Sequence, residues 1–423
     1  MEEVKLMQAE ILSTGDEICQ GTFIDTNSAH IAACLNDIGL RVARHQCVGD
    51  DIEALTAVFS EIGARADIAI ITGGLGPTVD DLSAQAAARA AGVDLVLDRA
   101  AENSIKDYFA KFSRTMSPSD IKQAMLPLGA MPILNFWGTA PGFIITLGRC
   151  RCYFLPGVPR EMEALLGAMV IPDILSFIGK TRNVFIKKEL SVFGLPEALV
   201  DAKLKGFGDR FPGIKLGMVA RFPVITVKMT AQGNDPNHLA EELEKAAEWS
   251  ARQLDDKVFS FEGRSMEAEV ARLLLKQKAT LAVAESCTGG LVSHLLTNIA
   301  GSSDYFLFSG VTYANQAKQA VLGVSDENLR KFGAVSEQIV REMAEGARRI
   351  SGAVYGLATS GIAGPSGGSP EKPVGTLCIA VSSQSGTVSR ILQSPFKERL
   401  SNKQIFAICA LDMLRKELLK KAA

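Results

Sequence analysis

The sequence predicts an α/β protein with two α/β/α domains, each built on a largely parallel sheet and joined by a small α+β unit. Three observations lead to this prediction. Apolar strand-sized segments alternate with amphipathic helical segments at both ends of the chain, a pattern typical of parallel sheets covered by helices. Glycine-rich turns follow several of the strand-like segments. The 423 residues exceed one ordinary hydrophobic core, which indicates two or three domains.

The first domain is expected over residues 1–172. Its expected strands are Ala9–Ser13, Arg41–Val48 and Asp67–Thr72, and its expected helices are Ser28–Ile38, Ile52–Ala64 and Asp81–Ala91. Gly39 and Gly92 follow two of these helices as stop signals. Ligands of parallel sheets bind beyond the carboxyl ends of the strands. The turns after the first and third strands are therefore candidate binding loops.

In the middle unit, residues 173–258, glycines mark the ends of the expected helices and strands less clearly. Strand-like segments at Val184–Ser191 and Ile214–Thr230 flank one helix, a charged helix is expected at Asn237–Gln253, and Asp255–Arg264 is expected to be a linker. The alternation resumes in a last domain, residues 265–423. Its expected elements begin with a helix from Ser265 and continue with Thr280–Ala284, Gly289–Asn298, Tyr305–Thr312, Ser336–Ile350, Tyr355–Ser360, Gly375–Ser382 and a closing helix from about Asn402.

Composition excludes several classes of function. The formal net charge of −2 gives no general attraction to nucleic acid or to a membrane surface. The longest apolar runs are strand-sized, so no membrane-spanning segment is expected, and the N-terminus lacks the layout of a signal peptide. Eight cysteines in a chain of this length do not predict a disulfide framework. Cys150 and Cys152 lack zinc-finger spacing and are expected to be buried free thiols, in keeping with a reduced, cytoplasmic protein.

The segment Ala284–Gly290, Ala-Glu-Ser-Cys-Thr-Gly-Gly, follows an apolar strand and opens a helix. A serine at this junction is exposed at the sheet edge, and the N–H groups of a helix N-terminus can stabilise an oxyanion or a phosphate. Gly289 and Gly290 would let a substrate approach the backbone closely. The alternative is that Ser286 or Thr288 only caps the helix.

A nucleophilic serine needs a base, and the next strand end offers one in Gly310–Lys318. The only histidine of this domain, His294, has a placement typical of packing or of a helix surface. A Tyr–Lys pair can replace histidine, because an ammonium lowers the pKa of a phenol and a crowded ammonium loses its proton more easily. Tyr313 and Lys318 could thus reach one pocket. Alternatively, Lys318 lies on a solvated helix surface and Tyr313 ends an amphipathic strand.

The third segment of interest is Ser360–Gly375, which combines many glycines with rigid prolines. This composition is typical of a loop of backbone donors wrapped around an anion, with a plain connector as the alternative. Arg399 and Lys403, near the start of the last helix, could add positive charge for a phosphate.

Together, the motifs Glu-Ser-Cys-Thr-Gly-Gly, Tyr-x-Asn-x-x-Lys and Gly-Ile-Ala-Gly-Pro-x-Gly-Gly resemble the C-terminal domain of the CinA family, the nicotinamide-mononucleotide deamidases. The resemblance implies that Ser286, Tyr313 and Lys318 are catalytic. It implies hydrolysis of nicotinamide mononucleotide to nicotinate mononucleotide and ammonia, without a metal or organic cofactor. The predicted substrate-binding residues are Thr288, Gly289, Gly290, Asn315, Gly361, Gly364, Gly367, Gly368 and Arg399. This chain has Lys403 where the family usually carries a second arginine, and lysine loses the bidentate fork.

Two glycine–acid turns dominate the first domain, Ser13–Gly21 and Thr72–Asp81. The second turn places backbone donors suited to phosphate before Asp80 and Asp81, two carboxylates suited to a hard divalent cation. A pyrophosphate bridged by a metal needs both parts. The spacing fits neither the Walker A loop nor the Rossmann fingerprint. Alternatively, the two aspartates simply favour a helix N-terminus.

With Asp25–Asn27, Gly138–Phe143 and Leu155–Met162, these turns are similar to the N-terminal domain of the CinA family, which is related to molybdopterin-binding domains. The resemblance implies metal-dependent hydrolysis of ADP-ribose to AMP and ribose 5-phosphate. The predicted metal ligand is Asp80 or Asp81, for magnesium, manganese or cobalt, with potassium beside it. Gly157 to Met162 would close the site or pack the core. The predicted ADP-ribose-binding residues are Gly15, Asp16, Glu17, Asn27, Gly73, Gly74, Gly76, Thr78, Gly138 and Thr139.

The middle unit resembles the KH-like segment of full-length CinA proteins. It has no Gly-x-x-Gly clamp and no basic–aromatic stripe, so RNA binding is not expected and a spacer or dimer contact is favoured. The expected partners are the two nucleotides and a second copy of the chain in a homodimer, with no direct nucleic acid and no membrane. Two other hypotheses stay open: an N-terminal domain that binds pterin or nucleotide without hydrolysis, and a protein-interaction factor for DNA uptake or recombination.

Overall fold

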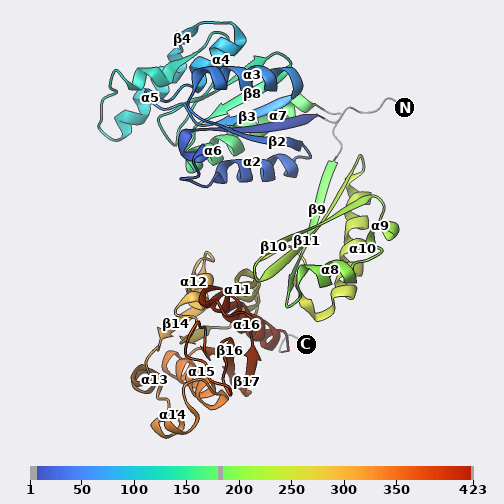
Figure 1. Cartoon of the computed structure of the whole chain (residues 1–423), viewed down its shortest axis with the longest axis vertical. Helices are drawn as coiled ribbons and strands as arrows, with labels where there is room; N and C mark the ends of the chain where they lie inside the picture. The colour runs from blue at the N-terminus through green and yellow to red at the C-terminus, as the bar shows by residue number, and fades with distance from the viewer. Residues whose placement is uncertain (1–6, 180–183, 421–423) are drawn as a thin grey trace. The chain divides into compact units, whose positions relative to one another are not determined.

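The computed structural model describes residues 7–179 and 184–420 and is of the predicted α/β class (Figure 1). The chain divides into two compact units, one built mainly from residues up to 186 and the other from residues 187–230 and 241 onward. Each unit is described by itself. None of the helices in the two described ranges combines the length and apolarity that crossing a membrane requires.

The first unit is built on a six-stranded sheet with the order β2-β1-β3-β8-β7-β6. The four strands from β2 to β8 pair in parallel, and β7 and β6 continue the sheet antiparallel. The strand bounds are β1 Gln8–Thr14, β2 Arg41–Val48, β3 Ile68–Thr72, β6 Met131–Ile133, β7 Gly142–Leu147 and β8 Cys150–Leu155. The three strands predicted in this region are confirmed. A separate ribbon pairs β4, Leu95–Leu97, with β5, Met125–Pro127.

Helices cover both faces of this sheet. Two separate apolar clusters, one on each face, fill the space between helices and strands. In Figure 1, α3 and α4 lie above the sheet, and α2 and α6 lie below it. The helix bounds are α1 Asp16–Cys19, α2 Thr26–Asp37, α3 Ile52–Arg65, α4 Ser83–Ala91, α5 Arg99–Lys111, α6 Pro159–Leu165 and α7 Ile171–Ile178. The last of these runs through residue 172, where the first domain was expected to end.

Local sequence signals explain where these helices begin and end. The Asp25 carboxylate accepts a hydrogen bond from the backbone N–H of Ser28 and caps α2. Gly92 takes the left-handed conformation that ends α4. α4 begins at Ser83, two residues later than predicted, because the Asp81 carboxylate accepts from the N–H and hydroxyl of Thr78 and keeps this segment in a turn.

The second unit contains a four-stranded sheet with the order β10-β11-β9-β12. Its strands are β9 Val184–Phe193, β10 Ile214–Arg221, β11 Val224–Gly233 and β12 Val258–Ser260, and the helices of this region are α8 Glu197–Lys203, α9 Phe207–Arg210 and α10 Pro236–Leu254. Two predictions were wrong here. Ile214–Thr230 is a hairpin rather than one strand, because Phe222 and Pro223 form a turn. The expected linker contains β12, which pairs with β9 and buries Phe259.

The C-terminal region contains a five-stranded sheet with the order β14-β13-β15-β16-β17. Its strands are β13 Leu281–Glu285, β14 Phe306–Val311, β15 Tyr355–Gly361, β16 Thr376–Ser383 and β17 Gly386–Gln393. β14, β13 and β15 are parallel, and β16 and β17 are antiparallel. β17 was not predicted, because it is an edge strand whose exposed residues do not form an apolar run.

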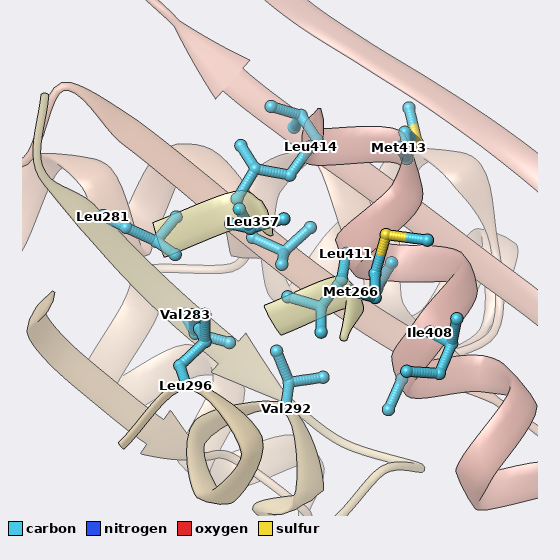
Figure 2. Packing of buried hydrophobic residues seen from close by; sticks show 14 of the residues in the cluster. Met266, Leu281, Val283, Val292, Leu296, Leu357, Ile408, Leu411, Met413 and Leu414 are labelled. Atoms are coloured by element: carbon cyan, nitrogen blue, oxygen red, sulfur yellow. The ribbon is translucent and has the colours of Figure 1, made fainter. Parts of the chain in front are cut away.

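Helices again pack on both faces of this sheet. Figure 2 shows apolar side chains of α16 facing those of β13 and β15, among them Leu411, Leu414, Val283 and Leu357. α15 covers the opposite face. The helix bounds are α11 Met266–Gln277, α12 Leu291–Thr297, α13 Asn315–Leu322, α14 Asp326–Phe332, α15 Glu337–Ser351 and α16 Arg399–Lys420. α16 begins three residues before the predicted start at Asn402, so Arg399 lies in its first turn.

Candidate active sites

Ser286 and Lys318 meet at the carboxyl ends of two neighbouring parallel strands. Ser286 is half-buried and directly follows β13, and Lys318 lies in the first turns of α13, which follows β14. Lys318 Nζ lies 3.2 Å from Ser286 Oγ. Lys318 is only 1% exposed, so the alternative that it lies on a solvated helix surface is wrong.

The surroundings of Lys318 favour its uncharged form. Burial lowers the pKa of this amine below the usual lysine range. Lys318 Nζ donates to the carbonyl oxygens of Thr312, at 2.8 Å, and Tyr313, at 3.0 Å. A neutral amine has two N–H groups and one lone pair. With the two carbonyls as acceptors for the N–H groups, the lone pair is left for the hydroxyl of Ser286.

Glu285 fills the N-terminus of α12. Its side chain is fully buried, and its carboxylate accepts from three backbone N–H groups and two hydroxyls: those of Gly290, Val292 and Ser293, and those of Thr288 and Ser293. The prediction that the N–H groups of this helix terminus stabilise an oxyanion or phosphate was therefore wrong. A buried carboxylate already neutralises the positive end of the helix dipole.

Neither Ser286 nor Thr288 is the residue that caps α12. Gly290 is the N-cap of α12 and makes no side-chain hydrogen bond, so the alternative that Ser286 or Thr288 only caps this helix is wrong. The Thr288 hydroxyl instead hydrogen-bonds Glu285 and Thr359. Within residues 7–179 and 184–420, no oxygen accepts from the backbone N–H groups of Cys287 and Thr288, which face the buried sulfur of Cys287. These two donors lie beside Ser286 in the chain and are candidates for an oxyanion site.

Tyr313 contacts Arg399. The tyrosine is 57% exposed, and its hydroxyl accepts from Arg399 Nη2 at 2.8 Å. Arg399 Nη1 donates to the carbonyl oxygen of Gly364 at 3.1 Å. The structure thus brings Ser286 together with Lys318, and it brings Tyr313 together with Arg399 and the glycine-rich loop.

Lys403 lies one helical turn after Arg399 and reaches the serine turn. Its Nζ is 3.5 Å from the position of a Cβ on Gly289. A Cβ at this distance would make an ordinary contact with the ammonium, whereas the φ of +59° at Gly289 is a conformation that glycine favours. Arg399 and Lys403 place two positive charges on one face of α16, facing the loops of the site.

The loop from residue 361 to 375 needs its glycines for close packing, which argues against a plain connector. A Cβ on Gly361 would lie 2.5 Å from the carbonyl oxygen of Thr376, and one on Gly364 would lie 2.6 Å from a methyl carbon of Val374. A Cβ on Gly368 would lie 2.7 Å from the backbone nitrogen of Val374. Two other predicted substrate-binding residues, Asn315 and Gly367, are exposed.

A second candidate site is a cavity of about 540 Å³ in the first unit, at the carboxyl ends of β1, β3 and β8. Ten of the predicted residues line it: Gly15, Glu17, Asn27, Gly73, Gly74, Gly76, Thr78, Asp80, Asp81 and Thr139. Asp16 and Gly138 are not among the lining residues. The carboxylate of Asp16 turns away to accept from the N–H of Asp50, and Gly138 is packed against Glu161.

The sequence analysis missed several residues of this cavity. Asp50, Gln123 and Glu161 also line it. Asp50 follows β2, so the rule on carboxyl strand ends could have found it. Burial raises the pKa of Glu161. The side-chain oxygens of Asn27 and Gln123 are buried and have no hydrogen-bond donor in the part of the chain that the structure describes. Such orphaned acceptors at a cavity indicate a ligand with hydroxyl or amine donors.

The acidic residues of the cavity offer candidate ligands for a divalent cation. The carboxylate of Asp81 is held by Thr78, which leaves Asp80 as the freer of the two predicted ligands. Burial raises the pKa of Asp50, and three nearby carboxylates raise it further: Asp16, Glu17 and Asp80. No described group of three or more His, Cys, Asp or Glu side chains is arranged to hold a metal ion. The residues fit a cation that takes one or two carboxylates and completes its coordination with phosphate oxygens.

Comparison with known proteins gives family matches along most of the chain. Residues 263–418 match the CinA C-terminal domain, residues 10–176 match the probable molybdopterin binding domain, and residues 187–260 match the damage-inducible protein CinA KH domain.

Similar proteins span the whole chain. A CinA-like protein of Desulfosudis oleivorans is 52% identical over 413 residues, covering 98% of this chain and all of its own length. A CinA-like protein of Desulforapulum autotrophicum is 45% identical over 417 residues, covering 98% of this chain and 99% of its own. Among solved structures, CinA from Thermoplasma acidophilum aligns at 38% identity and a TM-score of 0.37, covering 40% of this chain and 98% of that one.

Proposed function

Because the chain belongs to the CinA family, we propose that it is a pyridine-nucleotide hydrolase whose C-terminal domain deamidates nicotinamide mononucleotide to nicotinate mononucleotide and ammonia. One observation carries the proposal: a buried lysine amine of lowered pKa lies 3.2 Å from a half-buried serine hydroxyl. A hydroxyl so placed beside a neutral amine is an activated nucleophile that needs no histidine.

The proposed reaction has two halves. Lys318 takes the proton of Ser286 as Oγ attacks the carboxamide carbon, and the backbone N–H groups of Cys287 and Thr288 stabilise the oxyanion. The protonated lysine returns this proton to the leaving nitrogen, which departs as ammonia and leaves an ester on Ser286. Water, activated by the same amine, then hydrolyses the ester to the carboxylate and frees the serine.

The phosphate of the substrate is proposed to bind at Arg399 and Lys403. The Glu285 carboxylate already occupies the N-terminus of α12, so the phosphate cannot bind there. The cationic side chains of Arg399 and Lys403, in contrast, lie on α16 beside the loops of the site. In this arrangement Tyr313 acts through Arg399, whose guanidinium it orients by accepting a hydrogen bond from Nη2.

Lys318→Met tests this function directly, because methionine has a similar length and cannot accept a proton. Ammonia release from nicotinamide mononucleotide should fall by about 100-fold or more at saturating substrate. Gln319→Met, one position along the same helix and only partly buried, is the matched control and should retain activity. A Lys318→Met protein that keeps its melting temperature and deamidates nicotinamide mononucleotide at the wild-type rate contradicts the proposal.

A second activity is proposed for the first unit: hydrolysis of ADP-ribose to AMP and ribose 5-phosphate. The glycine-rich turn supplies donors for a pyrophosphate, and the orphaned oxygens of Asn27 and Gln123 fit ribose or adenine donors. A divalent cation would neutralise the pyrophosphate, and Asp80 and Asp50 are the residues proposed to hold it.

Release of AMP from ADP-ribose, measured with magnesium, manganese or cobalt and after chelation, tests this second activity. Hydrolysis that needs the cation and is lost in Asp80→Asn supports it. Binding of ADP-ribose without turnover would instead favour a nucleotide- or pterin-binding domain that does no hydrolysis.

A further inference from the structure

Two exposed cysteines face each other in the first unit. Cys19 ends the short helix α1 and Cys47 lies near the end of β2, and their Sγ atoms are 3.2 Å apart. Both are free thiols. This separation is shorter than an ordinary contact between two sulfur atoms, so the two thiols point at one another.

Hydrogen bonds join the turn before Cys19 to the residues that follow Cys47. Gly15 N–H donates to the carbonyl oxygen of Val48 at 3.1 Å. The N–H of Asp16 donates to the carboxylate of Asp50 at 3.1 Å, and the N–H of Asp50 donates back to Asp16 at 3.2 Å. A disulfide has an S–S distance of about 2.05 Å, so closing the bond takes roughly 1 Å of side-chain movement.

We propose that Cys19 and Cys47 form a redox-active dithiol site that an oxidised low-molecular-weight thiol converts into an intramolecular disulfide. The thiolate of Cys19 attacks the disulfide reagent, which releases one thiol and leaves a mixed disulfide on Cys19. Cys47 loses its proton and displaces the second thiol. Two electrons pass from the pair to the reagent, and the two protons end on the two released thiols.

Partial burial and the neighbouring Cys19 thiol raise the pKa of Cys47. We therefore assign Cys47 as the second thiol to react. The other cysteines differ in exposure: Cys150, Cys152, Cys287 and Cys378 are buried, and Cys34 and Cys409 are partly buried.

Neither cysteine lines the candidate nucleotide cavity, but both lie close in the chain to residues that do. Glu17 and Ile18, which line the cavity, directly precede Cys19, and Asp50, which also lines it, follows Cys47 by three residues. A disulfide would tie these two walls together covalently, so they could no longer adjust around a pyrophosphate and its cation. We therefore expect oxidation to slow ADP-ribose hydrolysis, an effect that rests on the activity proposed for this unit.

The first experiment tests whether the disulfide between Cys19 and Cys47 forms. The full-length protein is incubated with oxidised glutathione, and the thiols are counted after denaturation. Eight thiols should fall to six, and one cross-linked peptide that contains Cys19 and Cys47 should be lighter by two hydrogens than the two reduced peptides together. Cys34→Ser should behave like the wild type apart from its missing thiol, whereas Cys19→Ser should yield no cross-link. A protein that stays reduced, or that carries only glutathione adducts, overturns the proposal.

The second experiment tests whether the disulfide slows ADP-ribose hydrolysis. ADP-ribose hydrolysis should be several-fold slower in the oxidised protein, return with dithiothreitol and be insensitive to oxidation in Cys47→Ser. Equal rates in oxidised and reduced wild type overturn the coupling to the cavity. A reduced protein that does not hydrolyse ADP-ribose contradicts the proposed activity alone, because the cross-linked peptide is detected without it.

Discussion

At the scale of single residues, the chemistry depends on the charge of Lys318. This buried amine has a lowered pKa and donates to two carbonyl oxygens. Among the described residues, its one other hydrogen-bond partner is the hydroxyl of Ser286, which it would activate. A charged lysine at this position would be a donor to three oxygens and could not take a proton.

The pH dependence of deamidation follows from this. At low pH Lys318 is protonated and inactive as a base, so kcat/KM for nicotinamide mononucleotide should rise with pH. It should level off below the usual titration range of lysine, because burial lowers the pKa of this group. A pH–rate profile of ammonia release measures this. A rate that declines as pH rises through the same range contradicts the assignment.

Tyr313 offers a test that separates binding from chemistry. Tyr313→Phe removes the acceptor for Arg399 Nη2 but leaves Lys318 beside Ser286. KM for nicotinamide mononucleotide should rise several-fold, whereas kcat should change little. Steady-state kinetics decide the matter: a loss confined to kcat would assign Tyr313 to the chemical step, as the family resemblance implies.

Glu285 is the residue on which the serine turn depends. Its carboxylate accepts five hydrogen bonds in a fully buried position, so removing it leaves several donors without partners. Glu285→Ala should lower the free energy of unfolding of this region by about 3 kcal/mol. Urea unfolding monitored for the C-terminal domain measures this, and a change below about 1 kcal/mol would contradict the structural role.

At the scale of elements, the active site is held by the close approach of two segments. Gly361, at the end of β15, lies against the carbonyl oxygen of Thr376 and the sulfur of Cys287. Gly361→Ala should push these segments apart and reduce deamidation at least tenfold. Gly217→Ala is the matched control, since nothing lies within 4 Å of its added Cβ. Wild-type ammonia release by Gly361→Ala would show that the turn tolerates this shift.

The same scale shows what the sequence could predict. Apolar periodicity located β1, β3, β13 and β15, and the rule on carboxyl strand ends located both sites, because long buried strands leave a clear pattern. β12 and β17 were missed, since short or edge strands leave none, and β7 and β8 were not predicted although both are mostly buried. The role of the α12 N-terminus was wrong because no local pattern reveals that Glu285 turns back into the helix. Asp50 was missed although it follows β2, where the same rule could have found it.

At the scale of the whole molecule, the two proposed sites belong to different units, each with its own sheet and core. A substitution in one site should therefore abolish the activity of that site and leave the other activity unchanged. Asp80→Asn should abolish ADP-ribose hydrolysis and leave ammonia release unchanged. Parallel assays of both reactions on one preparation check this, and loss of both activities in this variant, with an unchanged melting temperature, would contradict independent sites.

The proposed function depends above all on Ser286 as the nucleophile of an amidohydrolase. Its test is ammonia release from nicotinamide mononucleotide by the wild type and by Ser286→Ala. We expect turnover by the wild type, a loss on the order of 1000-fold or more in the variant, and unchanged ADP-ribose hydrolysis in both. Equal ammonia release by the two proteins would contradict it.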